Sequence, residues 1–194
     1  MIYTCEIEGL TVQTGDLICT TDGGGTDITG QFWRFIGKLI PGEVDHIVIY
    51  VGPEGRCVEA GAKGKVIVFH TKGGVWDEKK MRSERGPFAD RFYGVAYPLG
   101  TGEGAAPGSS RVREDVAAYC LRQAELGKPY NLNFFSSTTE DAFYCSQLAY
   151  RAYLETGIDL NTGAKVYDIP GTQSIILPQE IWDGCRHERP LERP

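Results

Sequence analysis

Two neighbouring runs of hydrophobic and β-branched residues give the strongest structural signal in the chain. They cover residues 46–51 (HIVIYV) and 56–60 (RCVEA), and the four residues between them are Gly-Pro-Glu-Gly. This arrangement predicts a β-hairpin with its turn at 52–55. With a four-residue loop, the register places Glu59 on the same face as His46, at a diagonal cross-strand position. A three-residue loop would place the two side chains on opposite faces.

Shorter runs predict further strands at residues 14–19, 66–69 and 93–99. Together with the hairpin they indicate a meandering antiparallel sheet in the middle of the chain. A glycine-rich stretch at 21–30 is expected to form a flexible turn, because it lacks the Gly-Lys-Ser/Thr ending of a phosphate-binding loop.

Apolar residues spaced three and four apart predict the helices. The expected helical segments are 32–40, ended by Pro41-Gly42; a helix capped by Ser110 and ended by Gly127 and Pro129; a helix from about Phe143 through Tyr153; and a short helical turn at 177–182. The pattern therefore predicts an α+β domain in which an antiparallel sheet or barrel packs against helices. We expect a single domain over 1–194 with its core at about 14–182.

Composition narrows the function classes. The 194 residues are 41% hydrophobic and 24% charged, as in ordinary globular domains. The formal charge is -6 and no basic cluster occurs, so nucleic acid is not an expected partner. No apolar run reaches the roughly 18 residues of a membrane helix, and the first residues lack the features of a signal peptide. We expect a cytoplasmic protein without a membrane span, although a removed leader would not be visible.

The six cysteines are interpreted as thiols, because the chain is neither short nor visibly secreted. No Cys-x-x-Cys pair occurs, and one Cys/His grouping, Cys185 with His187, falls short of four zinc ligands. We therefore expect no metal and no cofactor.

Cys145 is the cysteine placed for catalysis. A thiolate nucleophile needs a lowered pKa, which a helix N-terminus or a neighbouring imidazolium can provide. Cys145 lies just inside a predicted helix start, where unpaired backbone N–H groups can also receive an oxyanion. The alternative interpretation is a small core residue, as expected for the cysteines on the predicted strands and on the apolar helix face.

A cysteine nucleophile needs a histidine base, and the histidine needs a third polar group that orients it. His46 has Glu59 predicted beside it, whereas His70 ends a strand and His187 lies in a charged tail. Cys145, His46 and Glu59 are therefore the candidate catalytic set. Taken singly, His46 and Glu59 would be ordinary surface residues of a strand.

Five motifs together resemble the circularly permuted branch of the NlpC/p60 superfamily, the YiiX/YebB-like group. They are Gly15-Asp16-Leu17-Ile18, His46 through Gly52, Val58-Glu59-Ala60, Gly127-Lys128-Pro129-Tyr130 and Phe143 through Leu148. The histidine precedes the cysteine, which is the reverse of the order in ordinary papain-like enzymes. The loop 131–141 matches no motif of the group.

The resemblance implies a circularly permuted papain-like α+β fold and a cysteine peptidase or amidase. Cys145 would be the nucleophile, His46 the general base and acid, Glu59 the residue that orients the imidazole, and Tyr130 a residue that lines the site and helps to bind the oxyanion. Asp16 would be structural. The expected substrate is an amide bond in a small or cell-wall-derived peptide.

Two other functions remain open from the sequence. One is lipid chemistry, an acyltransferase or thioesterase that uses the same Cys–His pair, although no hydrophobic anchor is visible. The other is a binding module that keeps the fold without catalysis. The sequence leaves the oligomeric state undetermined.

Overall fold

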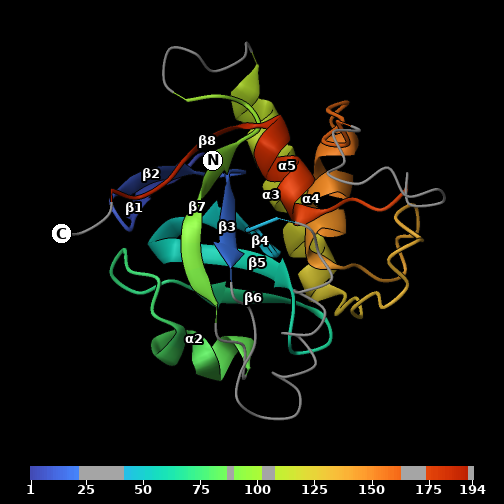
Figure 1. Cartoon of the computed structure of the whole chain (residues 1–194), viewed down its shortest axis with the longest axis horizontal. Coiled ribbons are helices and arrows are strands. Elements are labelled where there is room, and N and C mark those ends of the chain that lie inside the picture. Colours follow the sequence, from blue (N-terminus) through green and yellow to red (C-terminus); the bar gives the residue numbers. More distant parts are fainter. Residues whose placement is uncertain (22–41, 87–89, 102–107, 163–173, 192–194) are drawn as a thin grey trace.

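The computed structural model describes residues 1–21, 42–86, 90–101, 108–162 and 174–191, which form antiparallel strands and α-helices (Figure 1). A two-stranded sheet pairs β1 (Thr4–Ile7) with β2 (Leu10–Gln13). The main sheet has the strand order β6-β5-β4-β3-β7-β8, and every neighbouring pair is antiparallel. Its strands are β3 (Leu17–Thr21), β4 (His46–Gly52), β5 (Arg56–Ala60), β6 (Val66–His70), β7 (Arg91–Tyr97) and β8 (Arg186–Glu188). The helices are α2 (Glu78–Arg85), α3 (Ser109–Glu125), α4 (Cys145–Leu154) and α5 (Pro178–Gly184).

The predicted hairpin is present as β4 and β5. Its loop has three residues rather than the predicted four, because Gly52 pairs with Arg56, but a register shift between Tyr50 and Gly52 compensates. Ile49 therefore still pairs with Val58, which places Glu59 on the same face as His46 as predicted. A 3-10 turn, η1 (Pro53–Gly55), connects the strands. Gly55 has φ +75°, and a Cβ there would lie 2.2 Å from the Thr71 hydroxyl oxygen, so this tight turn requires glycine.

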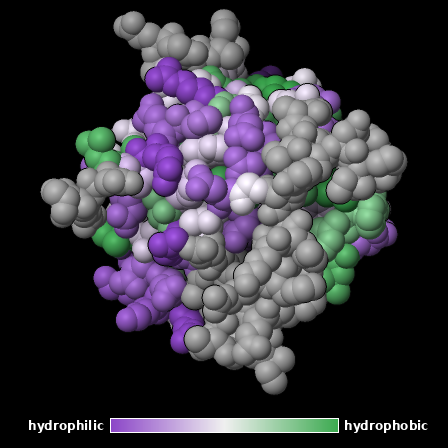
Figure 2. Space-filling model, in the orientation of Figure 1, coloured by the Kyte–Doolittle hydropathy of each residue, from purple (hydrophilic) through white to green (hydrophobic). Residues whose placement is uncertain are grey.

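Both faces of the main sheet are buried, as the hydrophobic alternation of β4 shows. Ile47 and Ile49 belong to a core shared with α3, α4 and α5, whereas Val48 and Tyr50 belong to a second core shared with the β1–β2 hairpin and α2. Figure 1 shows α3, α4 and α5 on one side of the sheet and α2 below it. In the same orientation, the described surface is largely hydrophilic (Figure 2).

The turn that precedes β3 ties two helices to the sheet. Tyr153 on α4 donates a hydrogen bond to the Gly15 carbonyl (2.6 Å), and Arg113 on α3 forms an ion pair with Asp16 (Nη1–Oδ1 2.6 Å). Both Asp16 and Arg113 are buried. Asp16 therefore makes the structural contacts expected of it.

The strand predictions are correct in position but not in every boundary. The run predicted at 14–19 is a strand only from Leu17, since residues 14–16 form the turn just described. The runs at 66–69 and 93–99 are β6 and β7. However, β7 does not continue the meander, because it crosses over to pair with β3.

The helices at Cys145 and Pro178 lie where predicted, although α4 begins two residues after the expected Phe143, which instead forms a bridge with Tyr130. Helix α3 ends before Gly127 as expected. The assignment of Ser110 as N-cap is wrong: α3 begins at Ser109, and its N-cap is Gly108 with φ +78°. Adjacent serines cannot be ranked as caps by type alone, and glycine is also accepted at this position. The predicted turn after Thr21 and the predicted helix at 32–40 lie outside the described residues.

Four elements were not predicted: the two strands of the N-terminal hairpin, α2 and the short strand β8. The N-cap of α2 is Asp77, whose carboxylate accepts hydrogen bonds from the backbone N–H groups of Lys79 and Lys80.

Within the described ranges, no helix is long and apolar enough to cross a membrane.

Candidate active site

The start of α4 is held by side-chain hydrogen bonds. Cys145 is the first residue of the helix and is 5% exposed. The Gln147 side-chain oxygen accepts hydrogen bonds from the Tyr144 backbone N–H (3.2 Å) and from the Asn131 amide (3.0 Å). The Ser146 hydroxyl donates to the Ile176 carbonyl (2.7 Å). The backbone around Cys145 is thereby fixed from both sides.

His46, the first residue of β4, contacts both predicted partners. Its Nε2 lies 2.8 Å from Oε2 of Glu59, and its side chain is hydrogen-bonded to the Cys145 side chain. Since Nε2 faces Glu59, Nδ1 is the ring nitrogen left for the thiol. The structure therefore brings Cys145, His46 and Glu59 into one buried cluster.

The electrostatics of this cluster favour the charged form of His46. Burial alone lowers the pKa of the imidazole, but the negative charges of Cys145 and Glu59 and the hydrogen bonds to them outweigh burial and raise the pKa of His46 to about 10. The environment is thus suited to an imidazolium at His46.

Glu59 is fixed by Arg85, the last residue of α2. Nε of Arg85 donates to Oε1 of Glu59 (2.9 Å), and Nη2 donates to Oε2 (2.7 Å). Burial raises the pKa of the Glu59 carboxyl, yet the charge of Arg85 and the hydrogen bonds of His46 and Arg85 lower it to about 2. Glu59 is therefore a carboxylate at neutral pH.

The same guanidinium binds a second carboxylate, that of Asp90. Nη1 and Nη2 donate to the two Asp90 oxygens at 2.6 and 3.0 Å. Asp90 also accepts hydrogen bonds from the Thr20 hydroxyl (2.7 Å) and from Nε1 of Trp76 (3.2 Å). The buried cluster at Cys145 thus continues to Arg85 and Asp90.

Tyr130 lies near Cys145. The Tyr130 backbone forms an isolated parallel β-bridge with Phe143, which lies two residues before Cys145. Burial, with a smaller contribution from the negative charge of Cys145, raises the pKa of the Tyr130 hydroxyl well above its ordinary value. The hydroxyl is therefore protonated at neutral pH and able to donate a hydrogen bond.

The other cysteines occupy different environments. Burial raises the pKa of three core thiols, Cys19, Cys57 and Cys120, and raises that of Cys185 to about 11. Cys5 is half-buried, and burial also raises its pKa. Cys19, Cys57 and Cys120 are thus in the environments of small core residues, whereas Cys5 and Cys185 are only partly buried.

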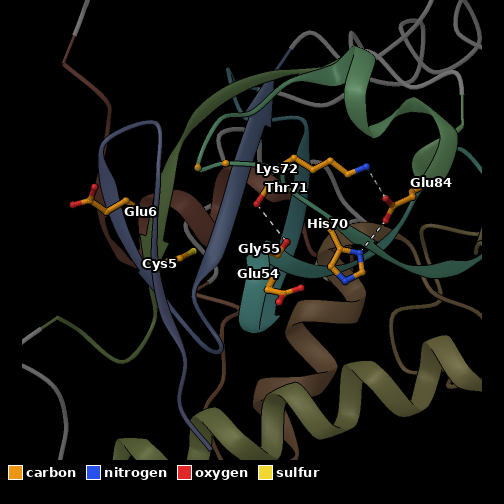
Figure 3. A pocket seen from close by; sticks show the side chains of 10 residues that line it. Cys5, Glu6, Glu54, Gly55, His70, Thr71, Lys72 and Glu84 are labelled. Atoms are coloured by element: carbon orange, nitrogen blue, oxygen red, sulfur yellow. Dashed lines mark hydrogen bonds and ion pairs between the residues drawn. The ribbon is translucent and has the colours of Figure 1, made fainter.

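The other two histidines have different partners. His187 stacks on Trp182 at a centroid distance of 4.2 Å, and His70 pairs with Glu84 (Nδ1–Oε2 3.0 Å). His70 and Cys5 both line a surface groove of about 600 Å³. Figure 3 shows them apart in that groove, with Glu54 and Gly55 between them, so they do not form a second Cys–His pair.

Sequence reasoning named Cys145, His46, Glu59 and Tyr130 but missed Arg85, Asp90 and Asn131. The segment that carries Arg85 is polar apart from Met81, a pattern typical of a solvent-exposed segment. Asn131 falls in the loop that matched no motif. Pattern alone gave no signal for these three residues.

Among the residues that the structure describes, no group of three or more His, Cys, Asp or Glu side chains is arranged to hold a metal ion. The described chain is thus an antiparallel α+β protein with a buried Cys–His–Glu cluster at a helix start.

Comparisons with known proteins add little to this description. No protein-family model matches the chain, and no curated protein matches it. A solved structure described as metalloprotein YiiX from Escherichia coli O157:H7 is similar at 18% sequence identity with a TM-score of 0.46, over 90% of this chain and 94% of that one. A likeness of this size defines neither the family nor the activity of this chain.

Proposed function

We propose that this protein is a cysteine hydrolase with a circularly permuted papain-like fold, which cleaves an amide bond in a small or cell-wall-derived peptide. The observation that carries the proposal is the contact of His46 with both Cys145 and Glu59. The substrate class is the one that the resemblance of the motifs implies.

The reaction follows from the roles of the three residues. The Cys145 thiolate attacks the carbonyl carbon, and the electron pair of the C=O bond moves to the oxygen. The C–N bond then breaks while imidazolium His46 gives its proton to the departing amine, which leaves a thioester on Cys145. His46 next removes a proton from water, the hydroxide attacks the thioester, and the thiolate leaves with the C–S electron pair.

The charge balance of the site suits both halves of this cycle. Next to burial, the charge of Cys145 is the largest influence on the pKa of His46, and it stabilises the imidazolium. When sulfur becomes acylated this charge is lost, so the imidazolium becomes a stronger acid when the leaving amine needs a proton. Glu59 remains ionised throughout and keeps the ring oriented.

The oxyanion would be bound at the start of α4. The backbone N–H of Cys145 has no acceptor within the helix, because the first-turn N–H groups of any helix lack one. In this proposal the Tyr130 hydroxyl is the second donor. Tyr130→Phe is expected to lower kcat by about 10²–10³ with little change in stability, the loss typical for one oxyanion donor. An unchanged kcat would remove Tyr130 from the proposal.

The first test is the pH dependence of alkylation by iodoacetamide, with the modified cysteine identified by peptide mapping. We expect Cys145 to react at pH 6 at least about tenfold faster in the parent than in His46→Ala, since a thiolate is the reactive form. Cys145→Ser is expected to abolish hydrolysis of peptide amides.

The matched control is His70→Ala, which removes the histidine of the surface groove and should leave the Cys145 rate unchanged. Equal Cys145 rates in the parent and in folded His46→Ala would contradict the proposal, as would hydrolysis by Cys145→Ser. Turnover of acyl thioesters with no amide cleavage would instead support the lipid-active alternative. A reactive Cys145 without any turnover would support a binding module.

A further inference from the structure

We propose that Arg85 is a positioning residue of the site: by binding Glu59 and Asp90 at once, it fixes the Glu59 carboxylate in the orientation that directs His46 at Cys145. This inference rests on the proposed function and assigns a role outside the Cys–His–Glu set.

The geometry leaves the Glu59 carboxylate little freedom. Two N–H groups of one planar guanidinium donate to its two oxygens at 2.9 and 2.7 Å, and the His46 ring contacts the second oxygen at 2.8 Å. A paired interaction of this kind sets the plane of a carboxylate as well as its position. The oxygen that contacts His46 therefore has its orientation set by Arg85.

Arg85 is itself held on all sides. It is fully buried, it binds the two oxygens of Asp90, and its guanidinium carbon lies 4.7 and 4.9 Å from the ring centroids of Phe69 and Trp76. Asp90 is in turn fixed by Thr20 and Trp76. The guanidinium is thus packed against two adjoining aromatic rings and hydrogen-bonded to two carboxylates, which makes it a rigid support.

The charges alternate along the network. Imidazolium His46, carboxylate Glu59, guanidinium Arg85 and carboxylate Asp90 sum to zero. Two thiols face this network: Cys145 interacts with His46, and Cys57 interacts with Arg85 and Glu59. A buried carboxylate is tolerated when it is paired and hydrogen-bonded. Without the guanidinium, two buried carboxylates would compete for one imidazolium, and the Glu59–His46 contact would no longer be the single favoured arrangement.

Lysine cannot replace this function in full. An ammonium group keeps the charge but has no planar fork with which to bind two carboxylates bidentately. Arg85→Lys therefore separates the orientation of Glu59 from simple charge balance, and its retained charge makes it better able to fold than Arg85→Met.

The test measures the pH profile of Cys145 alkylation in Arg85→Lys, Arg85→Met, Glu59→Gln and the double variant Glu59→Gln/Arg85→Lys. For Arg85→Lys we expect the rate at pH 6 to fall by about tenfold, the loss typical of a hydrogen bond to a charged group. If Arg85 acts through Glu59, Arg85→Lys should cause no further loss in the Glu59→Gln background.

The control is Arg113→Lys, a second buried arginine in a carboxylate pair, which lies on α3 and contacts Asp16. It should change stability without changing the Cys145 profile. Circular dichroism and urea unfolding show which variants are folded at the temperature of the assay, and Arg85→Lys decides the question if Arg85→Met does not fold.

A parent-like profile in folded Arg85→Lys would overturn the role of Arg85, as would losses that simply add in the double variant. Either result leaves the proposed function intact, provided that His46→Ala still slows the alkylation of Cys145. If Cys145 of the parent does not depend on His46, the proposed function itself fails.

Discussion

The molecule contains two buried arginine–carboxylate pairs that are similar in geometry but connect to different groups. Arg113 on α3 is bound to Asp16, the Thr14 carbonyl and the Gly100 carbonyl. Arg85 on α2 is bound to Asp90 and Glu59. Each joins segments that are distant in sequence, and each guanidinium is almost completely buried.

The two pairs differ in the groups to which their hydrogen bonds lead. The contacts of Arg113 end on backbone carbonyls and one carboxylate, so the pair fixes α3 against the turn before β3. The contacts of Arg85 continue through Glu59 to His46 and Cys145. Because buried ion pairs often contribute little net stability, burial of charge alone does not identify a functional site. A functional site is identified instead by the groups to which the hydrogen-bond network leads.

The largest expected effect is the loss of stability when Arg113 is removed from its pair with Asp16. Arg113→Met should lower the free energy of unfolding by about 3–5 kcal/mol, because the buried Asp16 carboxyl loses its ion-pair partner and, with a pKa that burial already raises to about 6, must be protonated. Urea unfolding measures the loss, and the alkylation rate of Cys145 in the folded variant should equal that of the parent. The control Arg111→Met removes an exposed i,i+4 pair with Asp115 and should change little. Slower alkylation of Cys145 in Arg113→Met would contradict the difference in role between the two pairs.

A smaller loss of stability is expected when Asp90, the carboxylate on the other side of Arg85 from Glu59, is changed. Asp90→Asn removes the charge that faces Arg85 but keeps a carbonyl that can accept from the guanidinium. We expect about 1.5–3 kcal/mol of lost stability, the range for hydrogen bonds to charged groups. The fall in Cys145 alkylation should be smaller than in Arg85→Lys, since Glu59 keeps its two donors. A larger fall than in Arg85→Lys would make Asp90 the residue that sets the site.

A third, smaller effect is a pH dependence of stability from neutral to alkaline pH, which the second network should show; Asp16 of the first network, whose pKa burial raises to about 6, titrates below this range. His46 has a folded pKa of about 10 and an ordinary value of 6.5, so its stabilisation is fully present below pH 6.5 and is lost as the pH rises towards 10. Glu59, with a pKa of about 2 against 4.5, stabilises above pH 4.5 and loses this contribution as the pH falls towards 2.

Urea unfolding of the parent and of His46→Gln at a series of pH values isolates this contribution. The stability difference between the two proteins should shrink by more than about 1 kcal/mol from pH 6.5 to pH 9.5, because one pKa unit corresponds to 1.36 kcal/mol. The same shrinkage should persist in an Arg113→Lys background. A difference that is constant with pH would mean that His46 is not held as an imidazolium in the folded protein.

The local parts of the site could be predicted from the sequence. The hairpin and the face that Glu59 shares with His46 were predicted, although the register shift after Tyr50 that produces this face was not, and the start of α4 placed Cys145 at unpaired N–H groups. Both predictions depend on residues close together in the chain, where turn chemistry and helical periodicity decide the geometry. The contact of Arg85 with Glu59 spans 26 positions, and no local pattern predicts it.

Local patterns in the chain are thus sufficient for the strands of the main sheet's centre, for two of the helix starts and for the face that His46 shares with Glu59. Long-range packing was needed to bring Cys145 on α4 to His46 and to bury Arg85 between Glu59 and Asp90. These contacts form when helices on opposite faces of one sheet pack against it. Their geometry is therefore set by the shape of the two cores rather than by any single segment of the chain.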